Sequence, residues 1–219
     1  MKVIIIGAGL SGLTTALALQ KHVAPKLPAD QPLEIEIYDE ARIRKPGEVE
    51  HSWRDHSDIR RQQQQNEETE GESESESGRK KTKNQGAAIS LQSNAFKVLR
   101  QLDHELADRV YASGLPTKGF TWKSRGNWVL GREDLEAFLV SRPVVVGCLM
   151  EALRARAGVE VVYRTVSEVK CGEGKMPVVY FDDGGEGVVA DLVVGADGIR
   201  SPVRKSLFGE EEGARPKYL

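Results

Sequence analysis

Three glycines near the amino terminus have the spacing of a phosphate-binding turn. Gly7, Gly9 and Gly12 lie in one uninterrupted hexapeptide. In such a turn the first glycine permits a sharp change of direction, the second lets the backbone approach a pyrophosphate, and the third lets helix and strand pack closely. The free N–H groups and partial positive charge at a helix N-terminus favour an anion there. The spacing predicts a dinucleotide site lined by Gly7, Ala8, Gly9, Leu10, Ser11 and Gly12.

An acidic residue after the next predicted strand supports this interpretation. Residues 33–38 alternate apolar and polar side chains, as a half-buried strand does, and Asp39-Glu40 follows. In dinucleotide sites a carboxylate roughly 20 residues beyond the glycines holds a ribose hydroxyl. Asp39 is therefore predicted to bind a ribose, with Glu40 as the less favoured substitute. The alternative is a strand–turn–helix unit that packs without a ligand.

The elements that must position these residues follow from the same stretch. Residues 3–6 are β-branched and apolar, which predicts a buried strand running directly into the glycines. Apolar residues then recur at helical spacing, and a proline-rich connection ends this helix near Ala24. The resulting strand, turn, helix and second strand form the start of a parallel sheet.

The rest of the chain predicts further short elements. Residues 86–91 are a short run of small and apolar residues. Strands are expected at 159–163, 166–169 and 178–181, a second buried strand at 191–194, and a hairpin at 120–123 and 127–130. Helices are expected from Asn94, with Ala95, Val98, Leu99 and Leu102 on one face, and from Pro143. Trp122 and Trp128 of the hairpin are interpreted as packing residues.

Residues 44–85 have a different composition from the rest. They contain a glutamine run, a Glu-Ser repeat and a basic cluster, with few apolar side chains. Such a segment cannot bury enough apolar surface to offset the entropy of ordering it. It is predicted to be a disordered surface insertion that serves as a solvated spacer. Phosphorylation of the serines among the glutamates is the alternative role.

Composition restricts the partners and the compartment. The formal net charge of −2 gives no reason to expect nucleic acid. Cys148 and Cys171 do not make a disulfide framework, and the four scattered histidines do not suggest a metal site. Glycines and polar residues dilute the apolar amino terminus, which argues against a signal peptide or a membrane span. We expect a cytoplasmic protein with a small-molecule substrate, and the oligomeric state is left open.

Two further motifs connect the chain to a known family. The segments GAGLSG (7–12), SRPVVVGCLMEAL (141–153) and GADGIRSPVR (195–204) together resemble the N-terminal part of the FAD-dependent aromatic hydroxylase superfamily. These are single-component flavoprotein monooxygenases, and salicylate hydroxylase-like enzymes are the most similar group. The resemblance implies an α/β fold: a Rossmann-like FAD/NAD(P)-binding domain with a parallel sheet and an added β-meander.

The resemblance also implies roles for individual residues. The glycines would line the ADP pyrophosphate of FAD, and Asp39 would bind the adenosine ribose. Arg142 would contact the pyrophosphate, unless it is an ordinary surface arginine. Asp197 and Gly198 would lie near the flavin pyrophosphate, and NAD(P)H would be the reductant. Arg204 would anchor the turn.

The chain departs from the family after its second signature. No third, Gly-Asp-Ala-Ala-His-like signature follows, so residues 1–219 are interpreted as an incomplete FAD-binding domain whose substrate sheet is truncated. No residue is assigned a catalytic role, because in this family the flavin carries the chemistry. The first hypothesis is an NAD(P)H-dependent monooxygenase that hydroxylates a small aromatic substrate, without full activity in this chain alone. The alternative is a non-catalytic dinucleotide-binding remnant or interaction module. An NAD-dependent dehydrogenase fits residues 195–204 less well.

Overall fold

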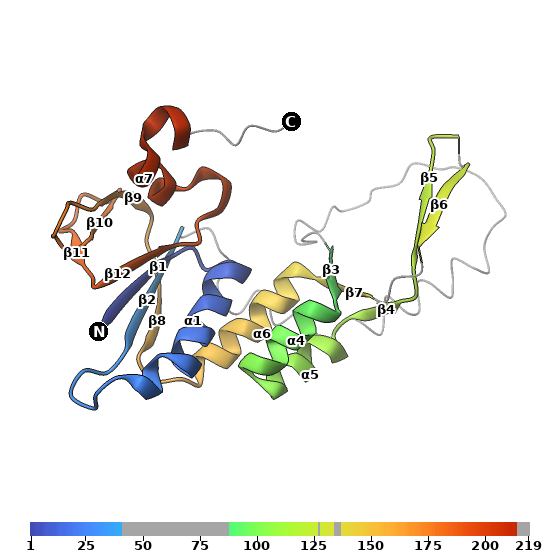
Figure 1. The fold of residues 1–219 in the computed structure, drawn as a ribbon, viewed down its shortest axis with the longest axis horizontal. Helices are drawn as coiled ribbons and strands as arrows, with labels where there is room; N and C mark the ends of the chain where they lie inside the picture. Colours follow the sequence, from blue (N-terminus) through green and yellow to red (C-terminus); the bar gives the residue numbers. More distant parts are fainter. Residues whose placement is uncertain (41–87, 127, 134–136, 214–219) are drawn as a thin grey trace, which may run out of the picture.

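The structure is a computed structural model that describes residues 1–40, 88–126, 128–133 and 137–213. Its centre is a four-stranded parallel sheet in the order β12-β1-β2-β8 (Figure 1). These strands are β1 (Lys2–Ile6), β2 (Glu34–Asp39), β8 (Val159–Tyr163) and β12 (Leu192–Gly195). All three pairings are parallel, so the carboxyl ends of the four strands meet at one edge. The predicted α/β fold with a parallel sheet is confirmed.

Strand β1 is apolar without a break because both of its faces are covered. Val3 and Ile5 belong to one buried cluster, and Ile4 and Ile6 belong to a second cluster on the opposite face. Successive side chains of a strand point to opposite faces, so each cluster receives every second residue. A strand covered on both faces has a continuous apolar sequence rather than an alternating one.

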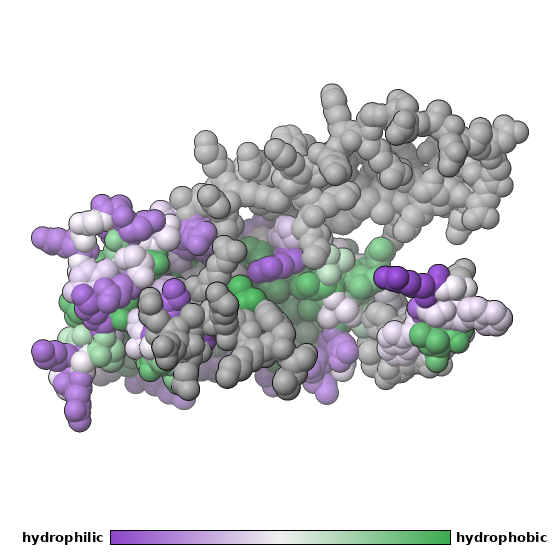
Figure 2. Space-filling view, turned by 90° about the horizontal axis from the view of Figure 1, so that it is seen from above, coloured by the Kyte–Doolittle hydropathy of each residue, from purple (hydrophilic) through white to green (hydrophobic). Residues whose placement is uncertain are grey.

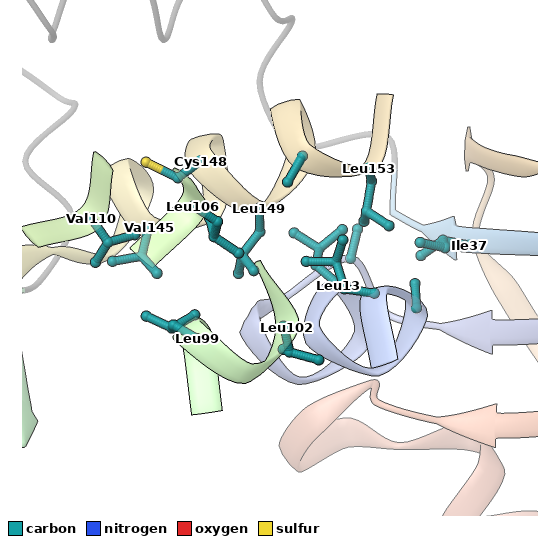
Figure 3. Packing of buried hydrophobic residues seen from close by; sticks show 14 of the residues in the cluster. Leu13, Ile37, Leu99, Leu102, Leu106, Val110, Val145, Cys148, Leu149 and Leu153 are labelled. Carbon is teal, nitrogen blue, oxygen red and sulfur yellow. The ribbon is translucent and has the colours of Figure 1, made fainter. Parts of the chain in front are cut away.

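Four helices form a layer that begins on one face of this sheet and extends beyond it (Figure 1). They are α1 (Leu10–His22), α4 (Ser93–Leu102), α5 (His104–Ala112) and α6 (Arg142–Arg154). Figure 3 shows Leu13 of α1, Leu106 of α5 and Leu149 of α6 meeting in the shared core. Helix α1 ends at His22, close to the expected stop, and a short 3₁₀ turn, Ala24–Lys26, follows.

An antiparallel sheet covers the opposite face. Strands β9 (Val166–Lys170), β10 (Val178–Phe181) and β11 (Val188–Val189) are joined in the order β11-β10-β9. Val169, Val179 and Phe181 are buried with Tyr38 of β2. Helix α7 (Pro202–Gly213) contacts β9 and β12. The expected β-meander is therefore the third layer of the fold.

The remaining strands differ in part from the prediction. Strand β3 (Ala88–Gln92) lies in the short apolar run noted in the sequence, and its neighbours β7 (Ala137–Ser141) and β4 (Leu115–Thr117) were not predicted. Strand β12 was expected to be buried. It lies at the edge of the sheet, however, and Leu192 is 40% exposed. In α4, Val98 is exposed while Leu99 and Leu102 are buried. The expected insertion, 44–85, lies outside the described residues.

The predicted hairpin forms, from β5 (Phe120–Lys123) and β6 (Val129–Glu133). It extends away from the helices, and hydrophobic side chains are visible on this part of the surface (Figures 1 and 2). Trp122 is 51% exposed and Trp128 is 77% exposed, so the interpretation as packing residues is wrong. Within the described residues no helix has the length and apolar character needed to cross a membrane.

Candidate functional site

The glycine turn at the end of β1 has a geometry that other residues cannot adopt easily. Gly7 has a φ of +107°, and its N–H donates to the Tyr38 carbonyl at 2.7 Å. A Cβ at Gly7 would lie 2.4 Å from the Ala196 carbonyl oxygen, and one at Gly12 would lie 1.9 Å from the Gly7 carbonyl oxygen. Both glycines therefore allow close approach of backbone to backbone, as the spacing predicts.

Gly9 leaves space at the start of α1 for a different reason. Gly9 is the N-cap of α1. No side chain caps the N–H groups there, and the first turn of the helix contains no acidic residue. Among the residues that the structure describes, a Cβ at Gly9 would have one non-neighbouring residue within 4 Å, Arg142, with Nη2 at 3.8 Å. Uncapped N–H groups with the positive end of the helix dipole favour an anion. This open backbone fits the phosphates of a dinucleotide.

Arg142 reaches this turn from a distant part of the sequence. It is the first residue of α6, with Pro143 in the first helical turn, and it is exposed. The close approach of its guanidinium to Gly9 follows from the packing of α6 against α1. A guanidinium presents several N–H donors in a plane that matches phosphate oxygens. The structure thus brings Arg142 and the glycine turn together.

Asp39 lies at the carboxyl end of β2, beside the same turn. Its Oδ2 accepts a hydrogen bond from the Ala8 N–H. Burial raises the pKa of this carboxyl above its ordinary value, and the N–H groups of Ala8 and Glu40 oppose that change. Glu40 itself is exposed. Asp39 is therefore held against the glycine turn, whereas Glu40, the less favoured ribose ligand, is exposed.

The motif after β12 reaches the same edge of the sheet. The Ala196 N–H donates to the Ile6 carbonyl at 2.7 Å, and Gly198 begins a 3₁₀ turn with a φ of +73°. Asp197 Oδ2 accepts a hydrogen bond from the Val203 N–H at 3.2 Å, near the start of α7. Asp197 therefore contacts the first turn of α7 in this structure. Helix α7 was not predicted from the sequence, so this contact could not be anticipated.

The Arg204 side chain donates to the Ile199 carbonyl, which spans the turn between β12 and α7. Ser201 is buried and its Oγ accepts from the Arg204 N–H at 2.9 Å. These contacts agree with an anchoring role for Arg204.

Sequence reasoning passed over one charged residue at this edge. Arg164 follows β8, and its backbone N–H donates to the Asp39 backbone carbonyl at 2.8 Å. Its side chain pairs with Asp183 at 2.5 Å. An arginine directly after a predicted parallel strand is the signal that could have drawn attention to it, because such positions lie at the ligand-binding edge.

Comparison with known proteins identifies the type of domain. A family model described as "FAD binding domain" matches residues 76–218. Zeaxanthin epoxidase from Spinacia oleracea is 30% identical over 139 residues, which cover 59% of this chain and 21% of that protein. The same enzyme from Solanum lycopersicum is also 30% identical over 139 residues, with the same coverage. The chain spans about a fifth of the length of these curated relatives.

Solved structures share the fold over nearly the whole chain. FqzB has a TM-score of 0.63 at 18% identity, covering 95% of this chain and 38% of that chain. The p-nitrophenol 4-monooxygenase PnpA from Pseudomonas putida has a TM-score of 0.61 at 17% identity, covering 94% and 43%. The 2,6-dihydroxypyridine-3-hydroxylase from Arthrobacter nicotinovorans has a TM-score of 0.56 at 20% identity, covering 95% and 39%.

Proposed function

The chain belongs to the family of FAD-binding domains, and from this premise we propose that it binds FAD along the carboxyl edge of its parallel sheet. The observation that carries the proposal is the convergence of three parts at one place. The open backbone at Gly9, the Arg142 guanidinium and the Asp39 carboxylate come from separate segments and meet beside the start of α1.

Each part suits one portion of the ADP half of FAD. The pyrophosphate would lie against the backbone of Gly7, Ala8, Gly9, Leu10, Ser11 and Gly12, with Arg142 neutralising its charge. Asp39 would accept hydrogen bonds from the adenosine ribose. Asp197 and Gly198 would lie on the side of the pyrophosphate nearest β12, because that strand is the neighbour of β1 opposite β2.

We propose further that the domain serves an NAD(P)H-dependent monooxygenase acting on a small, aromatic organic substrate. Bound FAD supplies the redox chemistry, and the protein binds and orients it. Support comes from the names of similar proteins, which describe an epoxidase, a monooxygenase and a hydroxylase. Two of these names contain an aromatic compound, p-nitrophenol or 2,6-dihydroxypyridine.

Titration of the chain with FAD tests the binding site. Asp39→Ala is expected to weaken FAD binding by about 1–3 kcal/mol, because ribose hydroxyls lose their acceptor. Glu40→Ala is the matched control, since Glu40 is the adjacent carboxylate and is exposed. Equal FAD affinities for wild type and Asp39→Ala would refute the assignment of Asp39.

The redox role needs a second measurement. NADPH consumption is followed beside product formation over a panel of phenolic acids, with FAD present. Oxidation of NADPH or NADH that depends on FAD supports the redox role, and product formed in step with it would show that this chain alone is a competent monooxygenase. FAD binding without any NADPH or NADH oxidation would favour a non-catalytic dinucleotide-binding module.

A further inference from the structure

The order of strands determines which residues lie beyond Asp39. The glycine turn follows β1, Asp39 ends β2, and β8 is the next strand along the sheet. Asp39 is paired in register with Tyr163, the last residue of β8. A dinucleotide with its pyrophosphate at β1 and its ribose at β2 therefore extends its base toward the carboxyl end of β8. This step rests on the proposed binding of FAD.

Arg164 is the residue that follows β8, and its side chain is held at several points. The guanidinium Nε and Nη2 donate to the two carboxylate oxygens of Asp183 at 2.5 and 2.7 Å. Its Cζ lies 3.7 Å from the centre of the Phe181 ring. The Phe181 ring in turn packs on Tyr38, with 4.8 Å between ring centres. Tyr38 immediately precedes Asp39, so the guanidinium is tied to the strand that carries the ribose ligand.

The turn opposite Arg164 is shaped around the guanidinium. A Cβ at Gly185 would lie 2.3 Å from Nη2 of Arg164, so the side chain occupies space that only a glycine leaves. The Gly185 N–H also donates to Asp183 Oδ1 at 3.0 Å, which orients the carboxylate toward the arginine. The Arg164 guanidinium and this N–H lower the pKa of Asp183 to about 2, so the pair stays ionised at neutral pH.

An isolated surface ion pair usually contributes little to stability. The Arg164 side chain is nevertheless fixed, and it is 28% exposed. Phe181 lies on the guanidinium, and the exposed part of the side chain leaves an open face that a flat ligand ring can reach. Holding that face in place before binding lowers the entropy lost when a ligand packs on it.

We propose that Arg164 recognises the adenine end of the dinucleotide. Its guanidinium, held by Asp183 and Phe181, forms the wall on which the adenine ring packs at the end of β8. In this assignment Asp183 and Gly185 are positioning residues that act through Arg164.

The test compares the affinity of the full chain for FAD and for ADP, which contains the adenosine and pyrophosphate alone. Arg164→Ala is expected to raise both dissociation constants by the same factor, about 3- to 10-fold, the range of a stacked cation. Arg164→Lys is expected to lose nearly as much, because an ammonium cannot stack or bind bidentately. Gly185→Ala should reproduce part of the loss with the positive charge retained. Gly185 does not have a positive φ, so alanine suits its backbone.

Arg109→Ala is the matched control, because Arg109 pairs with Glu151 at 2.9 Å on the helical layer. The inference would be overturned if Arg164→Ala left the affinities for FAD and ADP unchanged. It would also be overturned if Arg164→Lys bound both ligands as tightly as the wild type, or if Arg109→Ala lost as much affinity as Arg164→Ala. A loss for FAD without one for ADP would also overturn it, since the effect would then concern the flavin. A wild-type chain that binds neither FAD nor ADP would instead refute the proposed function itself.

Discussion

Gly9 and Gly12 lie three residues apart in one turn, yet the structure predicts opposite consequences for replacing them with alanine. At Gly12 the new methyl group would meet the Gly7 carbonyl oxygen at 1.9 Å and Ile5 Cγ2 at 3.3 Å. The first obstacle is backbone, so helix α1 must shift away from β1. Leu13 and Leu17 are fully buried in that helix and would lose part of their packing. At Gly9 the methyl group would meet Arg142 Nη2, at 3.8 Å, and no other atom of the described residues within 4 Å outside its own neighbours and helix.

These contacts set the expected magnitudes. Overpacking against backbone costs about 1–3 kcal/mol, and Gly12→Ala is placed at the upper end because no flexible side chain can yield. A loss of ~3 kcal/mol lowers Tm by about 6–12 °C in a chain of this size. In Gly9→Ala the unfolded chain has less conformational entropy, which stabilises the fold by about 0.4–1 kcal/mol. Alanine is a poorer N-cap than glycine, which destabilises the fold by a similar amount. Its net change in stability should stay within about 0.5 kcal/mol.

Urea denaturation measures the free energy of unfolding, and FAD titration measures binding. Gly12→Ala should lose stability, whereas Gly9→Ala should remain stable and lose at least about tenfold in FAD affinity, because its methyl group occupies the space of the pyrophosphate. The reasoning is refuted if Gly9→Ala is destabilised as much as Gly12→Ala. It is also refuted if Gly9→Ala binds FAD as the wild type does.

Other predictions concern the layers that support the site. Asp103→Ala removes the N-cap of α5, in which Asp103 accepts from the Leu106 N–H at 3.0 Å, and should cost about 1 kcal/mol at pH 7 by urea denaturation. That hydrogen bond lowers the pKa of Asp103. The stability that it provides is therefore present above the ordinary aspartate pKa and is lost as pH falls through the lowered pKa. A destabilisation by Asp103→Ala that persists fully at pH 2 would contradict this pH dependence. Leu149→Ala should cost about 2–5 kcal/mol, since Leu149 is 1% exposed between the helices, and a cost under 1 kcal/mol would be inconsistent with that packing. Trp128→Thr should change the free energy of unfolding by less than about 0.5 kcal/mol, because the side chain is largely exposed, and a larger loss would restore the packing interpretation.

Local sequence was sufficient to predict the parts of the site that are close together in the chain. The strand, the glycine turn, α1 and the strand ending at Asp39 were all predicted from periodicity and spacing. Each depends on neighbouring residues: an apolar run needs two covered faces, and a turn with a positive φ needs glycine at Gly7. The family resemblance extended this to the α/β fold and to the type of ligand.

Elements with weak local signals were missed. Strand β4 has three residues and contains Pro116, which lowers its strand propensity. Its pairing with β7 joins residues that lie 20 to 24 positions apart in sequence. Trp122 and Trp128 have the composition of core residues, but the hairpin carries them away from the buried clusters. Side-chain type alone cannot specify whether a partner surface is present.

Tertiary packing decided how the site is assembled. The sequence predicted a helix from Pro143 with Arg142 just before it, and only the packing of α6 on α1 placed the Arg142 guanidinium beside Gly9. The order of strands put Arg164 next to Asp39, and the start of α7 gave the Asp197 carboxylate a backbone partner. Local pattern specifies the conformation of a segment because its causes lie within a few residues. The meeting of distant side chains depends on how whole layers bury their apolar faces against each other, which no single segment contains.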